Sequence, residues 1–587
     1  MKRALFAILA LVLLSFSAFG QVKTFTGPSG GNWHNPANWT PPGVPNFDDN
    51  VHIETGVNVN VEGLGVDANV LINDGQIDNA GHINVCGEMF NDGVINNAGN
   101  LNVGDLANFE NAEINDAVNI VVANGMMNDG LILGKEGENL NLNINVAKND
   151  SAFGLNEENG QIIAQGENAG IQIVVDRGKF HNWGEIDAPG GAWLSADDID
   201  NIIGSRLRGK SVFLHARKDI LRNAGLIQTS GGTSPFGMGN NIEIVAFNKF
   251  GTGQFINSGT VQGGNGDPGH AGDNIIVKVD NLENSGDIRP GQNGSGIGVY
   301  GGNTTINARV VLLFDGGAVL AYDDEDGTTN VILVTDIIHM WSTYRTKSLL
   351  STDAMLRANS INLVGREIIL EDLADSTIIA TDYIELISIN SPSNVIDFSE
   401  ISNERIIVAN PTGEILIRGD SLIAPPIGYN AMCEPDPTVM GGSISVDDVT
   451  IIGETVMSFT GHSDSLEVLI RNEYTVSRTF NYSITSLLGW FAPVTGTTPT
   501  LAPWETHSFY VHFTIPSGFV VTVTDSVTSA VMGTLYPIKR WVSPIIAFPF
   551  DTLTYLNVAE TGAEKPEAMT ISAHPNPFNS SVSITAP

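Results

Sequence analysis

The stretch LINDGQ-IDNAGH-INVCGE-MFNDGV-INNAGN-LNVGDL, residues 71–106, divides into six hexads. Each hexad opens with an apolar residue: Leu71, Ile77, Ile83, Met89, Ile95 and Leu101. The third position is asparagine in four hexads, at Asn73, Asn79, Asn91 and Asn97, but valine in every third hexad, at Val85 and Val103. The repeating unit is therefore three hexads, or 18 residues.

A repeating unit of three short extended segments predicts a chain that winds around a three-sided core. Each hexad would be a short strand with an inward apolar residue, and each glycine in the fifth position would turn a corner with positive φ. Stacked coils place like residues together, so apolar residues form columns and corner asparagines can form ladders. The strands would be parallel and about 4.8 Å apart. Residue 71 should then lie beside 89, and 77 beside 95.

A seven-residue form of the phrase returns farther along the chain, at irregular intervals. The irregular spacing indicates loops inserted at corners, such as residues 263–274, and the stretch 348–358 could be a short inserted helix. β-Rich pattern continues at 360–373, 377–389 and 404–419. The copies are FHNWGEI at 180–186, LRNAGLI at 221–227, FINSGTV at 255–261 and LENSGDI at 282–288.

With its apolar-x-Asn-x-Gly-x-apolar phrase, the region 66–425 resembles the parallel β-helix passengers of bacterial filamentous-haemagglutinin-type adhesins. The resemblance implies an all-β, right-handed solenoid, although the strict hexads also suit a left-handed coil. It specifies fold rather than ligand, because the phrase is structural.

The N-terminus has the features of an export signal. Residues 1–20 combine Lys2 and Arg3, an apolar run and a small-x-small cleavage site, and no cysteine follows to anchor a lipid. No later apolar run is long enough to span a bilayer. In the capping segment, 21–65, Trp33 and Trp39 are expected to close the open end of the apolar column. The alternative is a sugar-stacking aromatic pair.

The C-terminal third changes character. After a Pro- and Gly-rich linker at 426–443, alternating strands predict an Ig-like β-sandwich over 444–555, with Trp490, Phe491 and Trp504 in its core. A second linker, 556–567, leads to residues 568–587. Pro575, Asn576, Pro577, Phe578 and Asn579 there resemble the opening of the type IX secretion C-terminal sorting domain. That resemblance implies a Gram-negative, Bacteroidetes-like source, the type IX machinery as a partner, and secretion or attachment to the outer-membrane surface. Only part of the sorting domain is expected within this sequence.

Charge and motifs limit the function. With 28 basic and 65 acidic residues the net charge is −37, which argues against nucleic acid and anionic membrane as partners. No nucleotide, hydrolase or CxxC motif is present, and Cys86 and Cys433 are expected to be unpaired. We therefore expect a non-catalytic, adhesin-like surface protein whose loops contact glycans, cells or matrix.

The alternative is a carbohydrate-active β-helix enzyme, which would need carboxylates from separate coils to converge with a basic residue in a groove. Its candidate residues are Asp197, Asp198, Asp200, Arg206 and Arg208. No cofactor is expected, except that Asp323, Asp324 and Asp326 imitate part of a calcium loop. In so acidic a chain, both clusters are more readily explained as solvated loops.

Overall fold

The computed structural model describes most of the chain between Gln21 and Phe548. The described ranges are 21–62, 65–144, 152–218, 220–230, 241–265, 272–291, 304–313, 318–320, 330–340, 355–370, 377–388, 395–397, 406–408, 414–418, 421–423, 430–432, 449–453, 456–473, 477–517, 523–532 and 539–548. Residues 1–20, Cys433, the acidic cluster at 323–326 and the Pro575–Asn579 motif lie outside them. No helix in the described ranges is long and apolar enough to cross a membrane.

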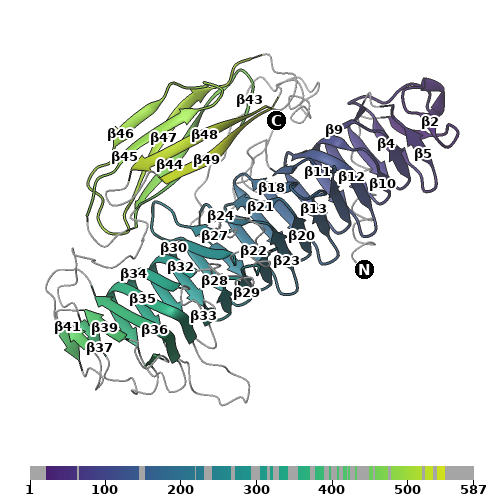
Figure 1. The fold of residues 1–587 in the computed structure, drawn as a ribbon. Coiled ribbons are helices and arrows are strands. Elements are labelled where there is room, and N and C mark those ends of the chain that lie inside the picture. Colours follow the sequence, from purple (N-terminus) through teal and green to yellow (C-terminus); the bar gives the residue numbers. More distant parts are fainter. Residues whose placement is uncertain are drawn as a thin grey trace, which may run out of the picture.

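The first unit is a long parallel β-helix (Figure 1), as the hexads predict. Its coils have three faces, which we call A, B and C after the hexads that open with Leu71, Ile77 and Ile83. Leu71 lies beside Met89 on face A, and Ile77 beside Ile95 on face B, so both predicted registers are confirmed. These apolar side chains are fully buried and form one continuous core along the stack.

The strands sort by face as follows. Face A contains β1 (Val22–Phe25), β4 (Asn50–Ile53), β7 (Val70–Asn73), β13 (Gly125–Asn128), β16 (Ala152–Asn156), β19 (Gly178–Asn182), β22 (Asp198–Asn201), β25 (Ile220–Asn223), β28 (Gln254–Asn257), β37 (Val395–Asp397) and β40 (Ser421–Ile423). Face B contains β2 (Gly31–Asn32), β5 (Asn58–Asn60), β8 (Gln76–Asp78), β10 (Val94–Ile95), β14 (Leu131–Gly134), β17 (Gln161–Ile163), β20 (Glu185–Ala188), β23 (Arg206–Gly209), β26 (Leu226–Thr229), β29 (Thr260–Gln262), β31 (Asp287–Arg289), β33 (Ala318–Leu320) and β38 (Ile406–Val408). Face C contains β6 (Val66–Ala68), β15 (Leu140–Ile144), β18 (Gly170–Val175), β21 (Gly191–Ala196), β24 (Val212–Ala216), β27 (Asn241–Ala246), β39 (Glu414–Arg418) and β41 (Asn430–Met432).

Longer strands bend around a corner and serve two or three faces. They are β9 (His82–Asn91), β11 (Gly99–Asn108), β12 (Glu113–Val122), β30 (Asn274–Asn284), β32 (Thr304–Leu313), β34 (Asn330–Met340), β35 (Met355–Leu370) and β36 (Thr377–Ser388). The start of β35 shows that residues 355–358 are strand, so the short helix considered for 348–358 does not extend over them.

The N-terminal end of the core is closed by aromatic side chains. A short 3-10 helix (Pro36–Asn38) and β3 (Trp39–Thr40) fold back, and β3 pairs antiparallel with β1. Trp33 and Trp39 are 0% and 1% exposed, and the Trp39 indole Nε1 donates to the Trp33 carbonyl at 2.7 Å. The sugar-stacking interpretation is therefore wrong, because neither ring offers a face to solvent.

Asparagines at the corner between faces A and B form a buried ladder. Each Nδ2 donates to the Oδ1 of the next asparagine in chain order at 2.7–2.9 Å. Most of these Nδ2 groups also donate to a backbone carbonyl on face B of the next coil. Each such side chain therefore bonds to both the side chain and the backbone of the neighbouring coil. The ladder comprises Asn73, Asn91, Asn108, Asn128, Asn156, Asn182, Asn201, Asn223, Asn257 and Asn284.

The corner glycines have two different causes. Gly81 and Gly99 have positive φ, as predicted, and so do Asn79 and Asn97. The glycines at the corner between faces A and B do not, and Gly75, Gly93, Gly184, Gly225, Gly259 and Gly286 belong to this group. A Cβ at Gly93 would lie 2.0 Å from the carbonyl oxygen of the corner glycine in the preceding coil. At these corners glycine is needed because two backbones approach closely, and the predicted explanation by positive φ is wrong there.

The second unit is a β-sandwich of two sheets, within the range predicted for it. One sheet is β42 (Val449–Gly453), β44 (Ser463–Asn472) and β47 (Thr506–Thr514). The other orders β43 (Val456–Phe459), β49 (Lys539–Phe548), β48 (Val523–Met532), β45 (Asn481–Ser486) and β46 (Val494–Thr497). Trp490 belongs to its buried core and Phe491 packs against that core. Trp504 is also buried, but its ring lies near the Arg471 guanidinium, 5.8 Å away.

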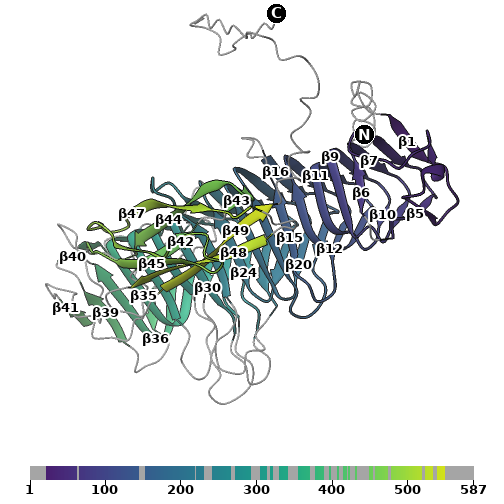
Figure 2. The ribbon, with the colours of Figure 1, turned by 90° about the horizontal axis from the view of Figure 1, so that it is seen from above.

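The sandwich lies against face C of the solenoid (Figures 1 and 2). Arg471, which is 0% exposed, donates to the Val279 carbonyl at 3.0 Å and to the Asp280 carboxylate at 3.2 Å. The same guanidinium holds both Glu473 carboxylate oxygens at 2.9 Å and lies over the Phe247 ring. A buried cation with two carboxylates and an aromatic ring makes this a specific docking contact.

Candidate functional site

The predicted catalytic cluster does not assemble. Asp198 and Asp200 face outward on β22 of face A, whereas Arg206 and Arg208 lie on β23 of face B. The corner at residues 202–205 separates the two strands, and Asp197 lies just before β22. Four of the five candidates therefore divide between two faces of the coil, and the fifth, Asp197, lies at the corner between β21 and β22.

Each acidic candidate is held by a basic neighbour on an adjoining strand or corner. Lys179 contacts Asp198 at 2.8 Å, and Lys218 contacts Asp197 at 2.6 Å. Asp200 lies 3.0 Å from the His181 Nδ1 and 3.2 Å from an Arg222 nitrogen.

Burial raises the pKa of Asp200, but the hydrogen bonds and charges of His181 and Arg222 outweigh burial. The net pKa is below the ordinary aspartate value. These carboxylates stabilise neighbouring coils, and Asp200 is unsuited to donate a proton.

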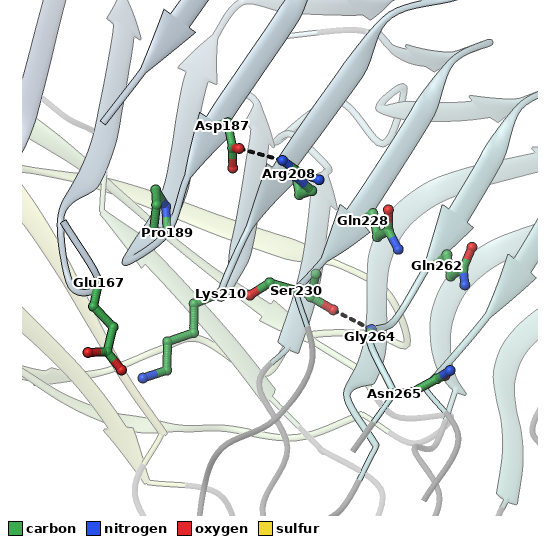
Figure 3. Close-up of a pocket in the computed structure, with 11 residues that line it drawn as sticks. Glu167, Asp187, Pro189, Arg208, Lys210, Gln228, Ser230, Gln262, Gly264 and Asn265 are labelled. Atoms are coloured by element: carbon green, nitrogen blue, oxygen red, sulfur yellow. Dashed lines mark hydrogen bonds and ion pairs between the residues drawn. The ribbon is translucent and has the colours of Figure 1, made fainter. Parts of the chain in front are cut away.

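On face B, Arg208 is part of a different candidate site. Its guanidinium contacts the Asp187 carboxylate of the preceding coil at 2.5 Å. This hydrogen bond and the carboxylate's charge raise the pKa of Arg208 above its usual value. The pair forms part of the wall of an open groove of about 590 Å³ (Figure 3).

The groove gathers polar side chains from successive coils along face B. Its described lining is Glu167, Asp187, Pro189, Arg208, Lys210, Gln228, Thr229, Ser230, Gln262, Gly264 and Asn265. Figure 3 places Glu167 and Lys210 toward one end and Gln262 and Asn265 toward the other. The Thr229 hydroxyl accepts a hydrogen bond from the Gly264 amide at 2.8 Å, which ties two coils together at the groove wall.

The groove contains two carboxylates from separate coils, Glu167 and Asp187, beside Arg208 and Lys210. Of the five predicted site residues, only Arg208 takes part, so sequence reasoning missed the others. Chemically, the lining can donate and accept hydrogen bonds along its whole length. Asp187 is committed to its ion pair, which leaves Glu167 as the uncommitted carboxylate among the lining residues.

Two other predicted features have no site in the described ranges. No group of three or more His, Cys, Asp or Glu side chains there could hold a metal ion, and the calcium candidates Asp323, Asp324 and Asp326 lie outside those ranges. Cys86 is unpaired and half-buried. Burial, with smaller contributions from the charges of Asp67 and Asp48, raises the pKa of the Cys86 thiol to about 12, so it is a poor nucleophile.

Comparisons with protein-family models, with curated proteins and with solved structures found no match to this chain.

Proposed function

We propose that this protein is an exported, non-catalytic surface protein that contacts glycans through the side of its β-helix. One observation supports this most: a polar groove crosses several coils of face B, while the predicted catalytic aspartates, on face A and at the corner before it, are held in ion pairs. An extended groove suits an extended ligand, because every coil adds another set of contacts.

Binding without turnover is the result that this proposal requires. The purified chain from residue 21 onward would be tested by affinity electrophoresis against soluble polysaccharides, in parallel with assays for new reducing ends and unsaturated products. Retarded migration with no product is expected. Product release by the unaltered protein would overturn the non-catalytic assignment.

A carbohydrate-active enzyme is the second candidate function. Its active site would be the pair of carboxylates in the groove, Glu167 and Asp187, rather than the aspartate cluster predicted from sequence. If product forms, Glu167→Gln and Asp187→Asn should abolish its release, whereas Asp198→Asn on face A should not. A matching loss in the Asp198 variant would count against the groove as the active site, because Asp198 lies on a different face.

Export by a type IX system is a separate part of the proposal. It is supported by the basic and apolar pattern of residues 1–20 and by the Pro575–Asn579 motif. In a host with that machinery, the intact gene product should reach the cell surface, and a version ending before residue 565 should remain in the periplasm. Equal surface delivery of both versions would refute the assignment of a sorting motif.

A further inference from the structure

A row of outward side chains, one from each successive coil, runs along the groove. Strand registers place Asp187 beside Arg208, Arg208 beside Gln228, and Gln228 beside Gln262. The next residue of the row, Arg289, lies beside Gln262 but is not among the described lining residues of the groove. Neighbouring parallel strands are about 4.8 Å apart, so the row runs along the solenoid axis. A ligand in contact with the groove-lining members of the row would lie parallel to that axis.

The charges of the described lining residues cancel. Two of these residues are acidic and two are basic, although the whole chain has a net charge of −37. Arg208 is neutralised by Asp187, and Lys210 lies toward the same end of the groove as Glu167 (Figure 3). An anionic polymer would find no excess positive charge among the described lining residues, and the net negative charge of the chain would repel it.

Amide side chains occupy the middle of the row. Gln262 accepts a hydrogen bond from Arg289 at 3.1 Å, which directs its NH₂ group away from that contact. Gln228 has no hydrogen-bond partner among the described residues and lies half-exposed on β26. An amide both donates and accepts, which matches a hydroxyl group that does the same. None of the described lining residues is aromatic, so hydrogen bonding rather than stacking would provide recognition by this part of the groove.

We infer that the groove binds a neutral, hydroxyl-rich polysaccharide lying along the coil axis, with Gln228 and Gln262 as its specificity-determining contacts. This inference rests on the proposed glycan-contact function and adds the class of ligand and the residues that select it. Neutral chains are accepted because the amides pair with their hydroxyls. Uronate-containing or sulfated chains are rejected because the described lining residues offer no surplus positive charge.

The test compares two sets of polymers by affinity electrophoresis. Xyloglucan, glucomannan, mixed-linkage β-glucan and dextran are the neutral set, and alginate, polygalacturonate and dextran sulfate are the anionic set. At least one neutral polymer should retard the protein, with little change between low and high salt, and the anionic polymers should not. Gln228→Ala and Gln262→Ala should each weaken binding about two- to tenfold.

Gln254→Ala is the matched control. Gln254 is an outward, half-exposed glutamine on β28 of face A, and its replacement should leave binding unchanged. Two results would overturn the inference but leave the proposed glycan-contact function intact. One is preferential binding of an anionic polymer, and the other is binding of a neutral polymer that is unaffected by both groove substitutions. Binding of neither class would instead sink the proposed glycan contact together with the inference.

Discussion

Asn108→Ala should destabilise the solenoid far more than its size suggests. Asn108 is 0% exposed and lies within the asparagine ladder. Its Oδ1 accepts from Asn91 at 2.7 Å, and its Nδ2 donates to Asn128 at 2.8 Å and to the Leu131 carbonyl at 3.2 Å. Alanine removes all three contacts from a place that water does not reach.

The cost follows from which partners are left alone. Asn91 keeps a second acceptor, the Glu113 carbonyl at 3.2 Å, so its Nδ2 remains satisfied. The Oδ1 of Asn128 loses its donor, and an unsatisfied buried acceptor costs about 1–3 kcal/mol. The lost net hydrogen bonding adds about 1 kcal/mol, so we expect a loss of about 2–4 kcal/mol in the free energy of unfolding.

Urea unfolding followed by circular dichroism measures this loss, with Asn119→Ala as the control. Asn119 belongs to a ladder at the surface, where it donates to Asn100 at 2.7 Å in a solvent-exposed hydrogen bond. Water can replace that partner, so the control should cost less than about 0.5 kcal/mol. Equal losses in the two variants would refute the argument that the buried ladder stabilises the stack.

In the same urea assay, Gly286→Ala should destabilise the solenoid, because the added Cβ would lie 2.1 Å from a backbone carbonyl oxygen. Gly134→Ala should destabilise it much less, because the nearest atom to the added Cβ would be 3.3 Å away. Arg471→Met leaves two carboxylates buried without their cation and should cost about 3–5 kcal/mol. It should also separate sandwich and solenoid unfolding in calorimetry, whereas Lys249→Gln at the exposed rim of the same contact should cost less than about 1 kcal/mol. Burial and a neighbouring guanidinium lower the pKa of His215 to about 3. The unfolded chain therefore binds the extra proton below about pH 6.5, and stability falls as the pH falls. Relative to His215→Gln, the natural protein should lose about 2 kcal/mol between neutral pH and pH 5, and parallel pH profiles for the two would contradict this assignment.

The sequence predicts the solenoid well because its repeat is strict. Apolar residues at fixed intervals leave one way to bury every one of them, so the register of Leu71 with Met89 follows from spacing alone. The same spacing also predicts that Asn73 and Asn91 are neighbours in the asparagine ladder. The close approach that requires glycine at Gly93 does not follow, since it depends on how tightly consecutive corners nest.

The docking of the two units depends on contacts between distant residues. Arg471 and Asp280 are 191 positions apart, and neither belongs to a repeat. A lone arginine on a sandwich strand gives no sign that a carboxylate on another unit will cover it. Local periodicity has no information about such pairs.

The groove was present in the pattern but was not recognised. Asp187, Gln228, Gln262 and Arg289 each come directly after one copy of the seven-residue phrase. A fixed position after a repeat falls at the same height on the same face of each coil, so these residues had to form a row. The clustered aspartates at 197–200 predicted a different site, but Asp198 and Asp200 lie on face A whereas Arg206 and Arg208 lie on face B.

The asparagine ladder tolerates very unequal coils. Successive ladder asparagines are separated by as few as 17 and as many as 34 residues, yet their hydrogen bonds differ in length by only 0.2 Å. Chain added at a corner therefore leaves the geometry above and below unchanged. The heritable unit of length is the whole coil: a duplication or deletion of one coil would move the far end by a single strand spacing, about 4.8 Å, and keep every remaining coil in register. A lineage with this architecture can lengthen or shorten its reach in fixed steps while varying its surface loops independently.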